Sequence, residues 1–323
     1  MPTNKFVSVV VVTYNSEKTV IETLDSIASQ TYRNIELIIT DDASQDKTVE
    51  LCKKWIIENE DRFINTELIT ATENTGISAN ANRGVKKARG EWLKLIAGDD
   101  LLDNRGIELF ISTYKGKNMI VCCDFISFSD SLIKHSNSHS KALLSKEGEK
   151  FHKRNAEEQL VCLLLGYRIC APSTIIRKDL FIKIGWFDER FQMIEDYPFC
   201  IKALSKGFRI DYCPILMAYY RIGNSVSRNS SMFYNEKYIN CLLNYEKEMT
   251  KSALPCKPII WLTFCFNSIA FTVFFHIFGN RKTKLSITLF NFYTKTTHKV
   301  IIYIYNILYS NKFGENIFKN NNR

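Results

Sequence analysis

Two adjacent carboxylates, Asp99 and Asp100, follow a short apolar run that has the length of one buried strand. The run, Trp92 to Ile96, stops at Gly98, and the two acids come directly after it. In an open α/β sheet, ligands bind just outside the carboxyl ends of the strands. Carboxylate oxygens placed there are hard ligands for Mg²⁺ or Mn²⁺ beside a phosphorylated ligand. An isolated pair is more simply a solvated turn, so its interpretation depends on the rest of the chain.

A second pair of acids, Glu195 and Asp196, stands at the start of an expected helix from Tyr197 to Lys206, which Gly207 closes. Taken alone, two negative charges in a first helical turn would simply complement the helix dipole.

The residues before Asp99 alternate between strand and helix patterns. Val7 to Val12 is a β-branched run, and Ile35 to Ile39 and Leu68 to Thr70 repeat it before the strand described above. Ser16 and Ser44 are expected to cap the helices between these runs. The alternation predicts an α/β fold with a doubly wound, mostly parallel sheet. Its binding edge would collect Tyr14, Asp41, Asp42, Asn74, Asp99 and Asp100.

Two common phosphate-binding motifs are absent from the sequence. It contains no Gly-x-Gly-x-x-Gly and no Gly-x-x-x-x-Gly-Lys, so neither a dinucleotide-binding fold nor a P-loop is supported. Without a glycine cradle, a diphosphate ligand would be neutralised chiefly by a divalent cation held on carboxylates.

The composition is that of a globular protein with one large domain or two ordinary ones, since 46% of the 323 residues are hydrophobic. Ten cysteines without Cys-x-x-Cys spacing indicate a reducing compartment and no structural metal cluster. The apolar run from Val7 to Val12 is too short for a signal-peptide core. We therefore expect the chain to begin in the cytoplasm.

The positive charge is concentrated near the C-terminus. Of the formal charge of +9, residues 281–323 carry most, with eight Lys or Arg against the single acid Glu315. Ile259 to Phe278 has twenty residues without a charged side chain, about the length that crosses a bilayer, while Val300 to Tyr309 is too short. Three readings stay open: an interfacial helical tail, a span or re-entrant hairpin, and a buried core or dimer interface. Basic residues beside apolar runs favour contact with an anionic membrane surface over nucleic acid.

A polar stretch from Ser129 to Arg154 interrupts the packed pattern and is expected to lie over one side of the ligand-binding cleft as a loop or lid. Its histidines are expected to be solvated rather than metal ligands: His135, His139 and His152. Further on, Trp186 and Phe187 are equally compatible with stacking on a substrate and with a place in the core.

Seven short motifs follow one another between about Val7 and Ser227. They are Val-Val-Thr-Tyr-Asn at 11–15, Asp-Asp-Ala-Ser-Gln-Asp at 41–46, Asn-Thr-Gly-Ile-Ser at 74–78 with Asn-Arg-Gly at 82–84, Gly-Asp-Asp at 98–100, Gly-Trp-Phe-Asp-Glu at 185–189, Ile-Glu-Asp-Tyr at 194–197 and Tyr-Tyr-Arg at 219–221. In this order they resemble the inverting family 2 glycosyltransferases of the GT-A fold. The resemblance covers roughly two thirds of the chain.

This resemblance implies a domain organisation and an activity. A GT-A domain would span 1–230, with a nucleotide-sugar-binding half at 1–103 and an acceptor half at 104–230, before a helical, membrane-associated region at 231–323. The enzyme would move a sugar, with inversion, from a nucleotide diphosphate-sugar, expected to be a UDP-sugar, to an acceptor hydroxyl. The acceptor would be a glycan, expected to be lipid-linked, in bacterial cell-surface polysaccharide synthesis such as O-antigen or capsule. The protein would then work in the cytoplasm at the inner face of the cell membrane.

The resemblance also implies residue roles. Asp196 would be the general base, supported by Glu195, and Asp99 with Asp100 would hold Mn²⁺ or Mg²⁺. The nucleotide-sugar would contact Thr13, Tyr14, Asn15, Glu17, Asp41, Asp42, Asn74, Gly76, Asn82, Arg83, Gly98 and Asp99, with the base recognised by Asp41 and Asp42.

Two positions depart from the pattern of the family. Ala97 replaces the first acid of the Asp-x-Asp motif, and Ala81 replaces an arginine that often precedes Asn82. These losses motivate an alternative, a catalytically silent nucleotide-sugar-binding module. A glycoside hydrolase with paired carboxylates is a third reading, and it predicts no nucleotide affinity.

Overall fold

The computed structural model describes residues 6–129, 140–142, 146–167, 169–222, 232–252, 254 and 257–313, so His135 and His139 lie outside the described residues. The chain divides into two compact units. The first consists of Met1–Lys153 and Ile169–Ile222, and the second of Arg154–Arg168 and Gly223–Arg323.

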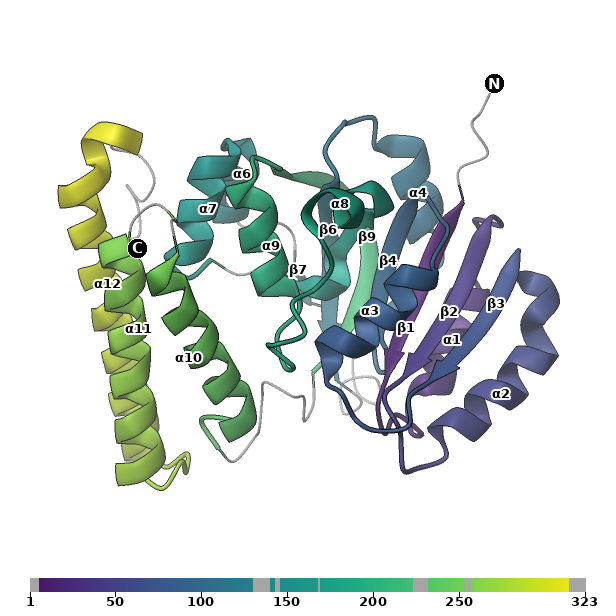
Figure 1. Cartoon of the computed structure of the whole chain (residues 1–323), viewed down its shortest axis with the longest axis horizontal. Coiled ribbons are helices and arrows are strands. Elements are labelled where there is room, and N and C mark those ends of the chain that lie inside the picture. Colours follow the sequence, from purple (N-terminus) through teal and green to yellow (C-terminus); the bar gives the residue numbers. More distant parts are fainter. Residues whose placement is uncertain are drawn as a thin grey trace. The chain divides into compact units, whose positions relative to one another are not determined.

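The first unit is built on one nine-stranded sheet (Figure 1). Its strands are β1 Val7–Thr13, β2 Ile35–Asp41, β3 Asn65–Thr70, β4 Trp92–Ala97, β5 Leu101–Leu102, β6 Ile120–Phe128, β7 Ser140–Ala142, β8 Thr174–Arg177 and β9 Ile210–Arg221. They lie in the order β3-β2-β1-β4-β8-β6-β9-β5, with β7 beside β6. β3, β2, β1 and β4 pair in parallel, as do β6 and β9, while β5, β7 and β8 pair antiparallel. The predicted α/β fold with a mostly parallel sheet is confirmed.

Helices cover both faces of this sheet. They are α1 Val20–Ala28, α2 Thr48–Asn59, the 3₁₀ turn η1 Glu60–Arg62, α3 Ile77–Lys87, α4 Gly106–Thr113, α6 Lys146–Lys153, the 3₁₀ turn η2 Ala171–Ser173, α8 Lys178–Ile184 and α9 Asp196–Ser205. α1, α2 and α4 share one core with Val9 and Val11 of β1. α3 lies on the opposite face, where a Cβ on Gly84 would come within 2.4 Å of Val10. Only glycine allows this close approach between helix and sheet.

The two predicted serine N-caps are wrong. α1 begins at Val20 and α2 at Thr48, so both helices start three residues later than N-caps at Ser16 and Ser44 would place them. Ser44 donates to Asp41 at 2.6 Å and accepts from the amide of Asn15 at 2.8 Å. Its hydroxyl is therefore used to join loops rather than to cap a helix.

The expectation that His152 is solvated is also wrong. The side chain is buried at the end of α6, its Nδ1 lies 3.3 Å from the carbonyl of Ile210, and its ring stacks on Tyr212. Burial lowers the pKa of His152 to about 4, so the imidazole is neutral near pH 7. The polar composition around it concealed the apolar face of α6, which packs on β9.

The second unit is helical, as predicted for the C-terminal region. It contains α7 Ala156–Leu164, α10 Glu236–Lys251, α11 Lys257–Phe271, a π-helical continuation at Thr272–Ile277 and α12 Lys284–Phe313. α11 packs against both α10 and α12. Among the described helices, the one from Lys257 to Ile277 is, by length and composition alone, able to cross a membrane.

Candidate active site

The loops that follow β1 and β2 are bound to each other at the carboxyl edge of the sheet. The side chain of Asn15 accepts from the amide of Gln45 at 2.8 Å. Glu17 donates its amide to Asp46 at 3.0 Å and accepts from the amide of Lys47 at 3.2 Å. These links explain the positive φ of 50° at Asn15, a conformation that asparagine tolerates better than most residues.

Asp41 lies buried beneath these two loops. Its Oδ2 accepts from the hydroxyls of Thr13 at 2.8 Å and Ser44 at 2.6 Å, and its Oδ1 accepts from the amide of Ser44 at 2.8 Å. The carboxylate therefore holds both loops, while Oδ1 has room for one more donor. Recognition of a base by Asp41 stays a prediction.

Asp42 is also buried and fastens the loop that follows β3. It accepts from the amides of Thr75 at 3.1 Å and Gly76 at 2.7 Å, and it forms an ion pair with Arg83 at 2.6 Å. The predicted site residues Asp42, Gly76 and Arg83 are thus in direct contact. These hydrogen bonds and this ion pair join Asp42 to other parts of the protein. Contact between Asp42 and a bound nucleotide stays a prediction.

The start of α3 is bound to the segment that leads to Asp196. Gly76 has a φ of 90°, and a Cβ there would lie 2.5 Å from the Cβ of Gln192. The buried side chain of Asn82 makes two hydrogen bonds to the backbone of Phe187. Its Nδ2 donates to the Phe187 carbonyl at 3.0 Å, and its Oδ1 accepts from the Phe187 N–H at 3.0 Å. Loops from the two halves of the first unit therefore form one packed structure.

The two aromatic residues after Gly185 differ in burial, and stacking of an acceptor on Trp186 stays a prediction. Phe187 is buried and packs against Phe181 and Phe199, so it belongs to the core. Trp186 is half-buried, stacks on Phe181 and lies beneath the ammonium of Lys86.

Arg221, the last residue of β9, holds the turn that carries Asp99 and Asp100. Its backbone amide donates to Oδ1 of Asp100 at 2.9 Å, and its Nε donates to the carbonyl of Asp99 at 2.7 Å. A terminal nitrogen pairs with Glu22 of α1, and the guanidinium lies over the ring of Phe128. The position of this turn is therefore set from three elements that are remote in sequence.

Gly98 allows the same turn to pack against the loop after β1. A Cβ at this position would lie 2.9 Å from the methyl of Thr13 and 3.1 Å from the hydroxyl of Ser16. The carbonyl of Gly98 accepts from the hydroxyl of Thr19 at 2.7 Å. The end of β4 and the start of α1 are thus joined directly.

The carboxylates of Asp99 and Asp100 are both shielded from water at the turn after β4. Asp100 is buried, and desolvation followed by the charge of Asp99 raises its pKa to about 7. Burial also raises the pKa of Asp99, which Arg221 partly opposes. Apart from its own backbone amide, the Asp99 carboxylate accepts no hydrogen bond from any residue that the structure describes.

A cation at this turn would need ligands beyond the protein. Within the described ranges, no three His, Cys, Asp or Glu side chains come together as a metal-binding group. A divalent ion that takes one or two carboxylates and completes its shell with phosphates and water fits the residues present. Ala97, where the family usually has an acid, is exposed at the end of β4.

The second acid pair lies at the N-terminus of α9, as predicted. Asp196 accepts from the amide of Tyr197 at 2.7 Å and is half-buried. Desolvation, followed by the charge of Asp196, raises the pKa of Glu195 to about 8. The two acids are adjacent, so a negative charge on one of them disfavours a negative charge on the other.

The two acid pairs lie near one thiol. Burial raises the pKa of Cys170 to about 12, and the negative charges of Asp100 and Asp196 both contribute. Lys94 is wholly buried beside them and donates to the carbonyls of Pro172 at 2.6 Å and Thr174 at 3.2 Å. The strand-end acids and the acids of α9 therefore belong to one region of the first unit.

The remaining predicted residues lie at the edge of the sheet with their side chains toward solvent. Tyr14 is 48% exposed, and Asn15, Glu17 and Asn74 are exposed as well. Thr13 is instead buried against Asp41.

Sequence reasoning missed three supporting residues. Arg221 is the last residue of the Tyr-Tyr-Arg motif, whereas Glu22 and Lys94 lie outside all seven motifs. The signals that could have found them are an acid in the first turn of α1 and a lysine inside an apolar strand, because a buried lysine needs partners.

Comparison with known proteins places this geometry in a family. A model described as Glycosyl transferase family 2 matches residues 8–185, more than half of the chain. An uncharacterized glycosyltransferase of Rickettsia typhi is 28% identical over 252 residues, which are 77% of this chain and 74% of the relative. The amylovoran biosynthesis glycosyltransferase AmsB of Erwinia amylovora is 29% identical over 206 residues, 62% of this chain and 65% of that protein.

Two solved structures share the fold at low sequence identity. Residues 1–349 of TarS from S. aureus, in complex with UDP-GlcNAc, have a TM-score of 0.58 at 20% identity, and the match covers 84% of this chain and 75% of that 1–349 fragment. The mannosyltransferase PcManGT of Pyrobaculum calidifontis, in complex with GDP-Man and Mn²⁺, has a TM-score of 0.57 at 16% identity. The match covers 95% of this chain and 89% of the PcManGT chain. With its GT-A-like sheet and a family match over more than half its length, the chain belongs to glycosyl transferase family 2 and is a glycosyltransferase.

Proposed function

We propose that this glycosyltransferase moves a sugar from a nucleotide diphosphate-sugar to a hydroxyl of a glycan acceptor, with inversion at the anomeric carbon. The observation that carries the proposal is that Asp100, at the end of β4, and Asp196, at the start of α9, both act electrostatically on Cys170, so the two acid centres lie in one region of the first unit. One centre suits a diphosphate with its cation, and the other suits proton removal.

In the proposed reaction, Asp196 takes the proton of the acceptor hydroxyl. The oxygen then forms a bond to the anomeric carbon as the bond from that carbon to the diphosphate oxygen breaks. The proton ends on the Asp196 carboxylate, and the nucleoside diphosphate leaves. Glu195, whose pKa is raised by burial and by the charge of Asp196, would support it from the preceding position.

The donor would lie along the edge formed by the ends of β1 to β4. Tyr14 and Asn74 offer exposed side chains there, and the loops beneath are held by Asp41 and Asp42. Asp99 and Asp100 would hold Mn²⁺ or Mg²⁺, which when bound stabilises the negative charge of the departing diphosphate. A UDP-sugar is the first donor to test, since TarS is in complex with UDP-GlcNAc, and a GDP-sugar is the second, since PcManGT is in complex with GDP-Man.

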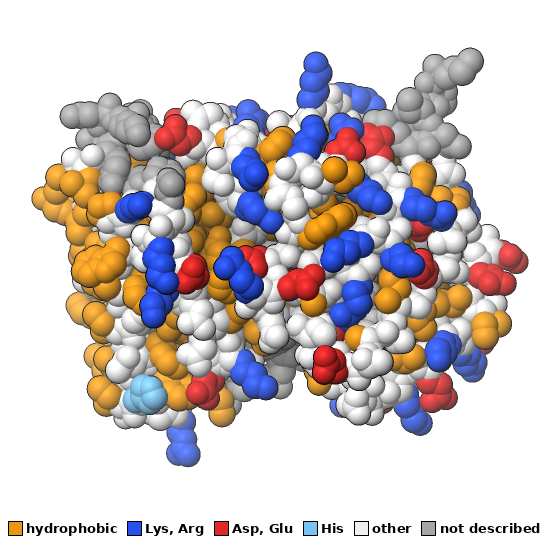
Figure 2. Space-filling view, viewed as in Figure 1, with side chains coloured by type: hydrophobic (Ala, Val, Ile, Leu, Met, Phe, Trp, Pro, Cys, Tyr) orange, Lys and Arg blue, Asp and Glu red, His pale blue; other side chains and the backbone are white. Residues whose placement is uncertain are grey.

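We further propose that the second unit binds the inner face of the cell membrane, where a lipid-linked acceptor for surface polysaccharide would be found. α11 and α12 expose large apolar side chains, and Figure 2 shows hydrophobic side chains gathered over these helices. Residues 257–313 contain no acid, while seven Lys and Arg lie among them. Apolar area with positive charge matches an anionic lipid surface. AmsB, by its name an enzyme of amylovoran biosynthesis, is a relative that supports a polysaccharide acceptor.

The test is a donor panel with purified full-length protein. UDP- and GDP-sugars would be offered with and without Mn²⁺, together with a lipid-diphosphate monosaccharide, and products would be detected by mass. Transfer that requires Mn²⁺ and gives an inverted linkage by NMR supports the proposal. Nucleotide binding without transfer or donor hydrolysis would instead support a silent binding module, which the exposed Ala97 motivates.

A further inference from the structure

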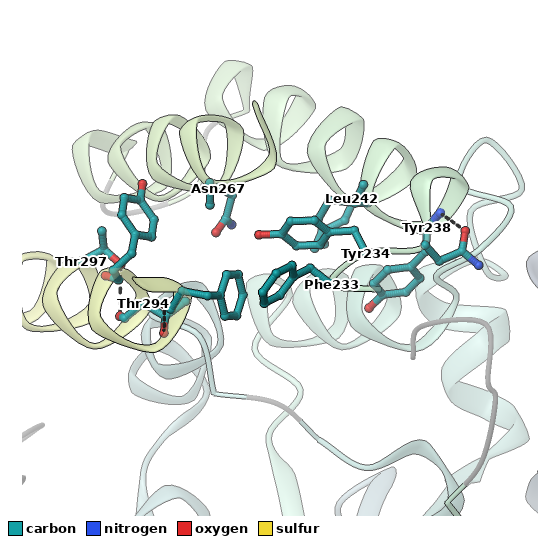
Figure 3. A pocket seen from close by; sticks show the side chains of 12 residues that line it. Phe233, Tyr234, Tyr238, Leu242, Asn267, Thr294 and Thr297 are labelled. Carbon is teal, nitrogen blue, oxygen red and sulfur yellow. Dashed lines mark hydrogen bonds between the residues drawn. The ribbon is translucent and has the colours of Figure 1, made fainter. Parts of the chain in front are cut away.

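The second unit contains a cavity of about 320 Å³ among α10, α11, α12 and the segment that precedes α10 (Figure 3). Five of its lining residues are aromatic: Phe233, Tyr234, Tyr238, Phe290 and Tyr293. None of the twelve lining residues is charged. The volume is near the lower end of ligand sites, which span about 300 to 1,000 Å³.

The aromatic wall of this cavity is fixed by hydrogen bonds. Asn280, buried in the turn between α11 and α12, accepts from the amides of Phe233 at 3.2 Å and Tyr234 at 2.9 Å. It also donates to the carbonyl of Tyr234 at 2.8 Å. The ring of Phe233 packs on Phe290 with 4.8 Å between centroids. The rings are therefore held in place by the fold of the helices.

One polar group of the wall is oriented by a buried carboxylate. Glu246, 2% exposed, accepts from Nδ2 of Asn267 through both of its oxygens, at 2.8 and 3.0 Å. This pairing turns the amide so that its nitrogen faces Glu246, which leaves Oδ1 of Asn267 as an acceptor.

Two polar groups of the wall have no protein partner in the described part of the chain. They are Oδ1 of Asn267 and the hydroxyl of Tyr234. Figure 3 shows the Tyr234 hydroxyl directed toward Asn267. Polar groups that line a cavity are normally satisfied by a ligand or by ordered water.

The lining selects among ligand classes. An anion is disfavoured, because no cation lines the cavity and the carboxylate of Glu246 lies next to Asn267. A hydrocarbon chain would leave Asn267 and Tyr234 unsatisfied, which costs free energy. A neutral sugar ring has apolar C–H faces for the aromatic rings and hydroxyls for the two polar groups.

We propose that this cavity binds one neutral sugar residue of the glycan acceptor. The inference rests on the proposed function, which supplies a glycan as the acceptor. It assigns to the second unit a carbohydrate site of its own, made entirely by that unit.

The test measures sugar binding without any donor. Full-length protein would be titrated with the methyl glycosides of glucose, galactose, mannose and N-acetylglucosamine, and saturation-transfer NMR would report which protons contact the protein. We expect at least one glycoside to bind, with its ring C–H protons saturated most strongly. Tyr234→Phe should weaken that binding about 3- to 10-fold, because one hydrogen bond is lost. Ala270→Leu, which fills the cavity from α11, should abolish it.

The matched control is Tyr303→Phe, which removes a hydroxyl from a tyrosine of α12 that is 66% exposed. It should leave binding unchanged. Circular dichroism and thermal unfolding check that each variant is folded, and if Ala270→Leu fails this check, Tyr234→Phe alone carries the test. Three outcomes would overturn the inference. They are no saturation with any glycoside, an equal loss of sugar binding in Tyr234→Phe and Tyr303→Phe, and displacement of the sugar by farnesol. Sugar binding without transfer in the donor panel would count against the proposed function and leave this site standing.

Discussion

The Nε of Arg221 donates a hydrogen bond to the carbonyl of Asp99 at 2.7 Å, although 122 positions separate the two residues. The same arginine donates its backbone amide to Asp100 and pairs with Glu22. The turn expected to meet the diphosphate is thereby fixed from the far end of the sheet.

Replacing this clamp should weaken the cation site. We expect Arg221→Lys to reduce transfer and Mn²⁺-dependent UDP binding about 10- to 100-fold, as supporting residues of metal sites do. A lysine cannot hold the Asp99 carbonyl and Glu22 together, because it lacks the forked guanidinium. Calorimetry of UDP binding across a Mn²⁺ series measures the change. Arg209→Lys, at an arginine paired with Asp211, is the control, and an unaltered Mn²⁺ requirement in Arg221→Lys would refute the assignment.

Neutralising the proposed base should remove chemistry and spare donor binding. We expect Asp196→Asn to lower the rate about 10²- to 10⁴-fold, the usual contribution of a general base. Initial rates and UDP affinity, measured on the same preparation, separate the two effects. Asp188→Asn, at an acid that pairs with the exposed Arg190, is the matched control. Parallel loss of UDP binding in Asp196→Asn would mean that this acid is structural.

Restoring the missing acid of the Asp-x-Asp motif should strengthen the metal site. Ala97 is exposed at the end of β4, so an aspartate can be introduced there without entering the core. We expect Ala97→Asp to lower the Mn²⁺ concentration that gives half-maximal UDP binding, and Asp99→Asn to raise it, because carboxylates are the protein ligands of such ions. If Asp99→Asn binds UDP with the same Mn²⁺ dependence as the unaltered protein, the metal assignment fails.

His152 should make stability depend on pH. Its pKa is about 4 in the folded protein against 6.5 when unfolded, so the unfolded chain binds more protons between these values. Stability from this group is present above pH 6.5 and is lost as the pH falls toward 4, by about 2 to 3 kcal/mol. His152→Phe keeps a ring against Tyr212 without the titration. Urea unfolding at pH 7.5 and 5.0 should show a smaller loss in the variant, and equal losses would contradict the assignment.

The apolar face of the second unit should bind anionic vesicles. Trp261 and Phe292 are 58% and 70% exposed, and replacing both with serine removes aromatic area without opening the core. We expect the double variant to sediment less with vesicles of phosphatidylglycerol and phosphatidylethanolamine, and both proteins to bind less as salt rises. Ile57→Ser, at a 76% exposed residue of α2, should not alter sedimentation. If the double variant sediments with vesicles as the unaltered protein does, the exposed aromatic residues of α11 and α12 do not contribute to membrane binding.

The elements that the sequence predicts well are those with a strong local signal. β1, β2 and β4 begin at the predicted residues, because each is a buried apolar run. β5 has only two residues and no pattern of its own, since its pairing with β9, Leu101 opposite Tyr219, stabilises it. Such long-range pairing is not visible in a local window of sequence.

The candidate site divides in the same way. The acids at strand ends, Asp41 and Asp99, are visible because a polar residue interrupts an apolar run. Their surroundings are not, since the donors to Asp42 come from a different loop and the clamp on Asp99 comes from β9. The serine caps failed for the same reason, because Ser44 has partners in another loop.

The mutual bonding of the loops after β1 and β2 has a consequence for attempts to redesign the enzyme. Asn15, Glu17, Ser44 and Asp46 bind across the two loops, so each loop keeps its shape only with the other in place. Replacing only one of these loops with the loop of a relative that uses another nucleotide-sugar would break these hydrogen bonds. The loop left in place would then be distorted. If the donor lies along this edge as proposed, changing the nucleotide specificity calls for exchanging both loops together, as a single cassette.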